Sequence, residues 1–323
     1  MSKRLRFLPL LALLAACSRS DTTDVAPLTA EETSLAQYLA DSRLDNGAYG
    51  WNIAPDATLD KTQAGFRSVT GITALGLLDA YKRDTESAVP TAADKLTVTK
   101  NYVYSQLTKY MADENATLSA TNLMFIAGYQ QEFGLSTQEW QTAADCLQKR
   151  LDDLDLTHGT EDDVTIDGWV NHTVELRTGQ NIVSLAGWEV AFILRGLVAM
   201  EAPKTEIDYA AARLLLMDYD PDSAYGVLSA AHALYALELV GDTTRREELV
   251  QLIVDKMDDT GRVGDDTQLS AYALMALRAA GREEADLVDE HLRSQVDEKG
   301  YILERDGKIY FEVVSEVISA LLH

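Results

Sequence analysis

The chain has 323 residues, a formal net charge of −24 and two cysteines. The acidic residues are spread along the whole sequence, which excludes nucleic acid and anionic membrane surfaces as electrostatic partners. Only Cys146 follows Cys17, so no intramolecular disulfide is expected in the rest of the chain. We therefore expect stability to come from a hydrophobic core, which a chain of this length can bury.

Residues 1–17 are predicted to be a bacterial lipoprotein signal peptide. Basic residues at positions 3–6 precede an apolar run at 7–16 that is too short to span a bilayer. The run ends in Leu14-Ala15-Ala16-Cys17, which resembles a lipobox and implies that Cys17 carries fatty acyl chains such as palmitate. Ser18 in the next position resembles the sorting signal for the Gram-negative outer membrane. Residues 18–30 are polar and are expected to form a flexible tether between this membrane anchor and the folded domain.

One short helical phrase recurs six times after the tether. Its clearest copies are Ala231–Leu237 and Ala271–Leu277. The other four copies begin at Gly71, Ala120, Ala191 and Ser315. Repetition at such intervals indicates stacked supersecondary units that cannot bury their apolar faces alone.

The repeats predict an all-α domain over residues 31–323. Amphipathic helices are expected near 31–43, 95–112, 138–154, 205–217, 243–258 and 283–296, several of them opened by capping boxes such as Thr29–Glu32, Ser136–Glu139 and Thr244–Glu247. Apolar helices are expected near 68–83, 117–131, 181–200, 224–239, 266–280 and 311–322. Six such hairpins form either an open superhelix or a closed (α/α)6 toroid. Closure is favoured because helices that are apolar over most of their circumference need cover on both flanks.

In a toroid the inner helices run parallel, so the loops before them gather at one mouth of the ring. Glycine beside an aromatic residue recurs in these loops, as at Trp51, Trp169, Tyr225 and Tyr301. Two of the loops are predicted to be short β-hairpins, at 302–312 and at 164–176. The second hairpin falls in the longest interval between copies, which runs from Ala120 to Ala191. An insertion at a ring mouth is a typical place for function.

The repeats and the Gln295 to Gly300-Tyr301 element resemble the terpenoid cyclase/protein prenyltransferase superfamily, as does, more loosely, Gln37 to Gly50-Trp51. The resemblance covers residues 31–323 and implies the toroid fold. Closed α/α rings also occur in polysaccharide lyases and glycoside hydrolases, and the repeat does not separate these groups.

The segment Gly264-Asp265-Asp266-Thr267 is similar to the Asp-x-Asp-Asp-Thr segment of class II terpene cyclases, with Val263 in the first acidic position. The resemblance implies that Asp265 acts as the proton donor; the alternative is that Asp265 or Asp266 caps the following helix. The zinc ligands of protein prenyltransferases are not matched, because Cys146 lies on an outer helix. We expect neither a metal nor a cofactor.

Two groups of side chains are candidates for a ligand site. The insertion carries Asp167, Trp169, His172 and Glu175, and carboxylates beside tryptophan suit a glycan. The alternative is a solvated acidic loop. The repeat register defines the second group, which combines the positions equivalent to Gln268 with those equivalent to Tyr272. The two sets of positions are four residues apart, so they share one helix face, which is expected to turn toward the lumen. Its members are Trp188, His232, Gln268, Tyr272, Glu312 and Glu316. The alternative is a filled core in which His232 is hydrogen-bonded and the glutamates pair with arginines such as Arg195.

These observations predict a secreted, lipid-anchored ligand-binding or scaffold protein. A glycan, peptide or hydrophobic ligand would lie at the mouth, against residues such as Trp51 and Trp188. One alternative is a polysaccharide lyase or glycoside hydrolase that uses mouth carboxylates such as Asp167 and Glu312. A second alternative, from the resemblance, is a terpenoid-cyclase-like enzyme that uses Asp265.

Overall fold

The computed structural model describes residues 26–113, 118–158, 187–222 and 224–323. Within these ranges the chain forms twelve α-helices and one two-stranded sheet, so the all-α prediction is confirmed. In the described ranges no helix is both long enough and apolar enough to cross a membrane.

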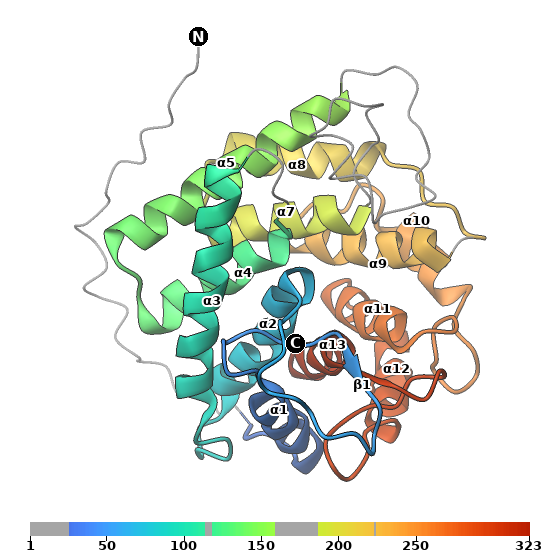
Figure 1. Cartoon of the computed structure of the whole chain (residues 1–323). Coiled ribbons are helices and arrows are strands. Elements are labelled where there is room, and N and C mark those ends of the chain that lie inside the picture. The colour runs from blue at the N-terminus through green and yellow to red at the C-terminus, as the bar shows by residue number, and fades with distance from the viewer. Residues whose placement is uncertain (1–25, 114–117, 159–186, 223) are drawn as a thin grey trace.

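The helices alternate between an inner and an outer ring (Figure 1). The inner ring consists of α2 (Arg67–Arg83), α4 (Ala120–Phe133), α7 (Gly187–Ala199), α9 (Ala224–Leu239), α11 (Thr267–Ala279) and α13 (Phe311–Leu322). The outer ring consists of α1 (Ala30–Ser42), α3 (Ala92–Ala112), α5 (Thr137–His158), α8 (Lys204–Leu216), α10 (Arg246–Val254) and α12 (Glu284–Ser294). These bounds follow the predicted hairpins closely, because the repeat and the apolar periodicity are both local signals.

The ring is closed. Each inner helix packs against the next one, and α13 packs against α2, which lies beside it in Figure 1. At this junction Ser315 Oγ donates to the Ile72 carbonyl oxygen at 2.7 Å and accepts from the Gly76 N–H at 3.0 Å. The outer ring is joined by an ion pair between Arg293 of α12 and Glu32 of α1, at 3.0 Å. The closed toroid is therefore confirmed over the open superhelix.

The difference between the two rings is a consequence of their residue patterns. In α12 the buried residues are Ala285, Val288 and Leu292, spaced three and four apart, so only one stripe faces the core. All residues of α13 except Glu312 are buried, which requires neighbours on every side. Small residues permit this close packing: a Cβ on Gly71 would lie 2.6 Å from the backbone nitrogen of Asn122.

Two of the three predicted capping boxes are present. Thr29 and Glu32 bond reciprocally at the start of α1, and Ser136 and Glu139 do so before α5. The third box is wrong, since α10 begins at Arg246 without a side-chain cap. The Thr244 N–H donates to Asp242 instead. The helix is correspondingly shorter than predicted.

The first and last mouth loops pair with each other. Strand β1 (Asn52–Ile53) lies antiparallel to β2 (Ile309–Tyr310), with Asn52 opposite Tyr310. The hairpin predicted at 302–312 is therefore wrong in its pairing. Its turn at Gly307 does form, closed by a Glu304 N–H bond to the Lys308 carbonyl oxygen, but the strand that follows pairs across the ring junction. Ring closure supplied a partner from the opposite end of the folded domain, which no local pattern can predict. The hairpin predicted at 164–176 lies outside the described residues.

Candidate functional site

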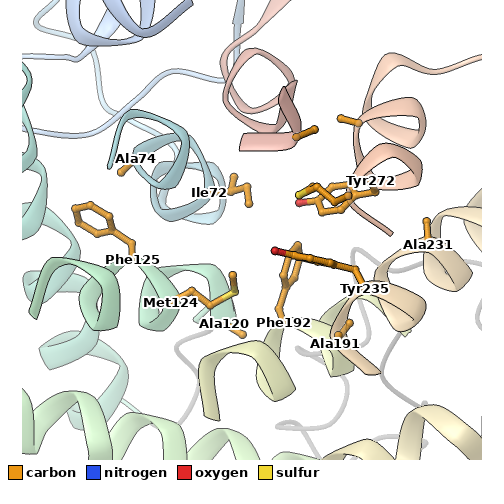
Figure 2. Close-up of a cluster of buried hydrophobic side chains, with 14 of the residues drawn as sticks. Ile72, Ala74, Ala120, Met124, Phe125, Ala191, Phe192, Ala231, Tyr235 and Tyr272 are labelled. Carbon is orange, nitrogen blue, oxygen red and sulfur yellow. The ribbon is translucent and has the colours of Figure 1, made fainter. Parts of the chain in front are cut away.

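Two layers of side chains from the inner helices face the lumen of the ring. We call the layer at the mouth, where the inner helices begin, the mouth layer; its members are half-buried or exposed, and they are Ser68, Trp188, Leu228, Gln268 and Glu312. One helical turn deeper is the floor layer, whose members are at most 8% exposed: Ile72, Thr121, Phe192, His232, Tyr272 and Glu316. Figure 2 shows Ile72, Phe192 and Tyr272 of this layer pointing toward one another from three different helices. The side chains of the mouth layer are thus partly exposed, and those of the floor layer are buried.

Four of the six residues that the repeat register predicts for the lumenal face are in direct contact. Gln268 Nε2 lies 2.9 and 3.0 Å from the two carboxyl oxygens of Glu316. The Tyr272 hydroxyl donates to Glu316 Oε1 at 2.9 Å, and the His232 ring lies against the Tyr272 ring with their centroids 3.5 Å apart. These contacts join α9, α11 and α13: His232, Tyr272 and Glu316 meet within the floor layer, and Gln268 reaches Glu316 from the mouth layer.

Glu316 is a buried carboxyl with neutral partners. Burial raises its pKa well above the usual range, and the charge of Glu312 raises it further. Burial, followed by the charge of Glu316, also raises the pKa of Tyr272, so the phenol remains a neutral donor. The predicted alternative of a glutamate–arginine pair is not what the structure shows for Glu316. Arg195 lies instead over the Tyr235 ring, at 4.8 Å from its centroid.

Glu312 lies one turn before Glu316 on the same face of α13. Its side chain is half-buried and belongs to the mouth layer. Burial, followed by the charge of Asp266, raises the pKa of Glu312 to about 7. This carboxyl can therefore give up or take up a proton near neutral pH, which is a property of general acids and bases.

His232 is neutral and lies in an aromatic environment. Burial, followed by the charge of Arg195, lowers its pKa well below the usual value. Its ring meets Phe192 edge-on at 4.8 Å. Within the described residues His232 Nδ1 is buried without a hydrogen-bond partner, which differs from the predicted hydrogen-bonded core histidine.

Two aromatic pairs stand at the mouth. Trp188 packs against Tyr225 with centroids 5.8 Å apart, and Tyr225 is 57% exposed. Trp51 meets Phe66 edge-on at 5.4 Å, and both rings are partly exposed. The sequence drew attention to Trp188 and Trp51 but not to Phe66 as a site residue. Phe66 directly precedes α2, and that position is the signal that could have found it.

The two aspartates of the cyclase-like segment have different roles. Asp266 caps α11, because its carboxylate accepts from the Gln268 N–H at 2.7 Å. The side chain of Asp265 is 80% exposed and forms ion pairs with Arg305 at 2.8 Å and Arg262 at 3.8 Å. A carboxyl that protonates an alkene must be held protonated by burial. Asp265 does not meet that requirement, so the cyclase-like alternative loses its proposed acid.

The remaining sequence candidates are placed as follows. Asp167, Trp169, His172 and Glu175 lie outside the described residues. Cys146 is buried against the Leu107 carbonyl oxygen, and burial raises the pKa of its thiol to about 12. Among the described side chains no group of three or more His, Cys, Asp or Glu residues is arranged to hold a metal ion.

No protein-family model and no curated protein matches the sequence. Solved structures do match the fold. A type II terpene cyclase from Scytonema superposes with a TM-score of 0.59 at 13% identity, covering 90% of this chain and 95% of the cyclase. The GH76A α-1,6-mannanase from Salegentibacter gives 0.56 at 10% identity, with 91% and 98% covered. An unsaturated glucuronyl hydrolase from Streptococcus agalactiae gives 0.51 at 10% identity, with 92% of each chain covered. The chain therefore has an α/α-toroid fold like that of these proteins, and identities this low establish the fold alone.

Proposed function

We propose that the protein binds a glycan in the mouth of its ring. The observation that carries this proposal is the mouth layer, where the Trp188 ring lies in the same half-buried layer as the polar groups of Gln268 and Glu312. The apolar face of a sugar stacks on an aromatic ring, while its hydroxyls bond to amide and carboxyl groups. The fold is compatible with this role, since the mannanase and the glucuronyl hydrolase are glycan-active by name.

Replacing Trp188 tests the proposal. The protein is applied to an array of oligosaccharides, and the affinity for each retained glycan is measured by calorimetry. We expect Trp188→Ala to weaken binding about tenfold or more, since loss of an aromatic stacking surface costs on the order of 1–2 kcal/mol. Leu239→Ala is the matched control, because Leu239 is an exposed apolar residue at the opposite end of an inner helix. Failure of the wild-type protein to retain any glycan would contradict the proposal.

A second candidate function is hydrolysis of the bound glycan, and the position of Glu312 favours it. This carboxyl is partly accessible in the mouth layer and has a pKa of about 7, which suits a general acid at neutral pH. Hydrolysis would release new reducing ends from a glycan that the array identifies. If a retained glycan stayed intact over prolonged incubation, hydrolysis would be excluded and the binding role would remain.

We also propose that the ring is tethered to the outer membrane through a lipid on Cys17. The support for this proposal is the basic, apolar and Leu14–Cys17 elements of the N-terminal sequence. A tethered ring would present its mouth to glycans of the cell envelope or its surroundings.

A further inference from the structure

The charges that act on the carboxyls of the mouth layer and of the layer below it are negative. The charge that acts most on Glu312 is the carboxylate of Asp266, and the charge that acts most on Glu316 is Glu312 itself. Gln268, the neighbour of Asp266 on α11, is neutral. Among the described residues, a ligand group placed beside Glu312 therefore meets carboxyls and neutral donors.

Three basic groups on the two loops that precede α11 and α13 form ion pairs with carboxylates outside the mouth layer. The pairs are Arg262–Asp258 at 3.3 Å, Arg305–Asp265 at 2.8 Å and Lys308–Asp306 at 3.5 Å. Within the part of the chain that the structure describes, no ion pair neutralises Glu312.

Of the inner-helix cations, Arg67 begins α2 at the mouth, where its charge acts on Tyr102 of the outer helix α3, and Arg195 lies on the other side of the floor layer. Arg195 follows Phe192 by three residues on α7, and its guanidinium packs over Phe192 and Tyr235. Its charge acts on His232 and Tyr272, which separate it from the mouth. The lumen therefore has an acidic side at the mouth and a cationic group beyond an aromatic floor.

We propose that the mouth selects glycans that carry primary ammonium groups, with Glu312 as the residue that pairs with the ammonium. This inference rests on the proposed glycan-binding function and specifies its ligand class. An ammonium beside Glu312 offsets the repulsion from Asp266. A neutral acetamido sugar gains only hydrogen bonds there, and a uronic acid adds a further like charge.

Binding of an ammonium group has a proton signature. Because the pKa of free Glu312 is about 7, this carboxyl is mostly protonated at pH 6 and must ionise to pair with the ligand. About one proton is then released for each glycan bound. The titratable and polar groups around Glu312, or one layer deeper, come from α13, the start of α11, α9 and α7; they are Glu316, Asp266, Gln268, Tyr272, His232 and Arg195. The loop before α13 contributes Glu304, whose pKa is raised by burial, and α2 contributes Arg67 and Ser68 at this level. The outer helix α1 contributes Tyr38, which is stacked on Phe311. Neither Glu316 nor His232 changes its charge at pH 6, since burial holds both neutral.

The experiment compares three hexasaccharides of one length at pH 6: β-1,4-linked glucosamine, β-1,4-linked N-acetylglucosamine and α-1,4-linked galacturonic acid. Calorimetry in two buffers of different ionisation enthalpy gives affinity and proton release together. We expect the glucosamine hexamer to bind at least tenfold more tightly than its acetylated counterpart, with release of about one proton, and the uronate to bind most weakly.

Glu312→Gln is expected to weaken binding of the glucosamine hexamer about tenfold and to abolish proton release. Glu298→Gln makes the same charge change on an exposed loop residue and should alter neither quantity. If Glu312→Gln fails to fold, proton release by the wild-type protein decides the matter.

Equal or tighter binding of the acetylated or uronate hexamer overturns the inference and leaves the glycan-binding function standing. Binding of none of the three hexamers also overturns it. In that case the oligosaccharide array shows whether the proposed function falls as well.

Discussion

At the scale of single residues, the unusual feature is a carboxyl buried among neutral donors. Glu316 is 3% exposed and is hydrogen-bonded by an amide and a phenol rather than by a cation. A carboxyl in such a place keeps its proton well above the pH at which it would ionise in an unfolded chain. Between those two pH values the folded state holds more protons than the unfolded state, so stability falls as pH rises.

Glu316→Gln should therefore stabilise the protein at high pH. The amide can keep the contacts with Gln268 and Tyr272 but cannot ionise, so the stability lost by the wild type above about pH 4.5 is not lost by the variant. At pH 8 we expect the free energy of unfolding to be about 1–2 kcal/mol higher in the variant, with the difference shrinking toward pH 4.5. Urea denaturation at both pH values measures it. A difference that grows on acidification would show that the carboxyl is ionised in the native state.

At the scale of secondary-structure elements, ring closure depends on the contact between the first and last inner helices. Gly76 of α2 faces Ser315 and Ile318 of α13 so closely that an added Cβ would overlap Ser315 Oγ and lie 2.5 Å from the Ser315 carbonyl oxygen. Gly196 of α7 is also in the interior of an inner helix, but its added Cβ would meet nothing nearer than 3.9 Å. Alanine substitutions at these two glycines therefore distinguish the effect of helix propensity from the effect of close packing between α2 and α13.

Gly76→Ala should destabilise the protein by about 2 kcal/mol or more, because backbone atoms of α13 must move to admit the methyl group. Gly196→Ala should be neutral or stabilising by about 0.5–1 kcal/mol, the usual effect of replacing glycine in a helix. Thermal unfolding of both variants beside the wild type gives the comparison. Equal effects of the two substitutions would mean that the α2–α13 contact does not limit stability.

The sequence predicted the helices better than it predicted the mouth, for a physical reason. Apolar periodicity and the repeat are local properties, and they also placed Gln268, Tyr272 and Glu316 on one lumenal face. The pairing of β1 with β2 joins residues that only ring closure brings together. The choice of partner for a buried charge is equally non-local. Arg195 was a reasonable predicted partner for a buried glutamate, but Glu316 instead accepts hydrogen bonds from the neutral side chains of Gln268 and Tyr272, and Arg195 packs over Tyr235.

At the scale of the whole molecule, the proposed lipid anchor and the fold of the ring can be tested separately. No helix of the described residues is long and apolar enough to cross a bilayer. Stable anchoring through lipid requires more than one acyl chain, which the lipobox resemblance at Cys17 provides. The described part of the ring begins with the capped helix α1 at Ala30, which follows Cys17 in the sequence.

Cys17→Ser should accordingly change where the protein is found without changing how it folds. In a Gram-negative host, we expect the wild-type protein to incorporate labelled palmitate and to sediment with outer membranes. The variant should lose both properties, while the purified ring keeps its melting temperature within about 1 °C, because Cys17 precedes the helices of the ring in the sequence. Cys146→Ser is the matched control, since that thiol is buried and cannot be acylated in the folded ring. If the wild-type protein were released in soluble form without label, residues 1–17 would be an ordinary cleaved signal peptide and the anchor would be refuted.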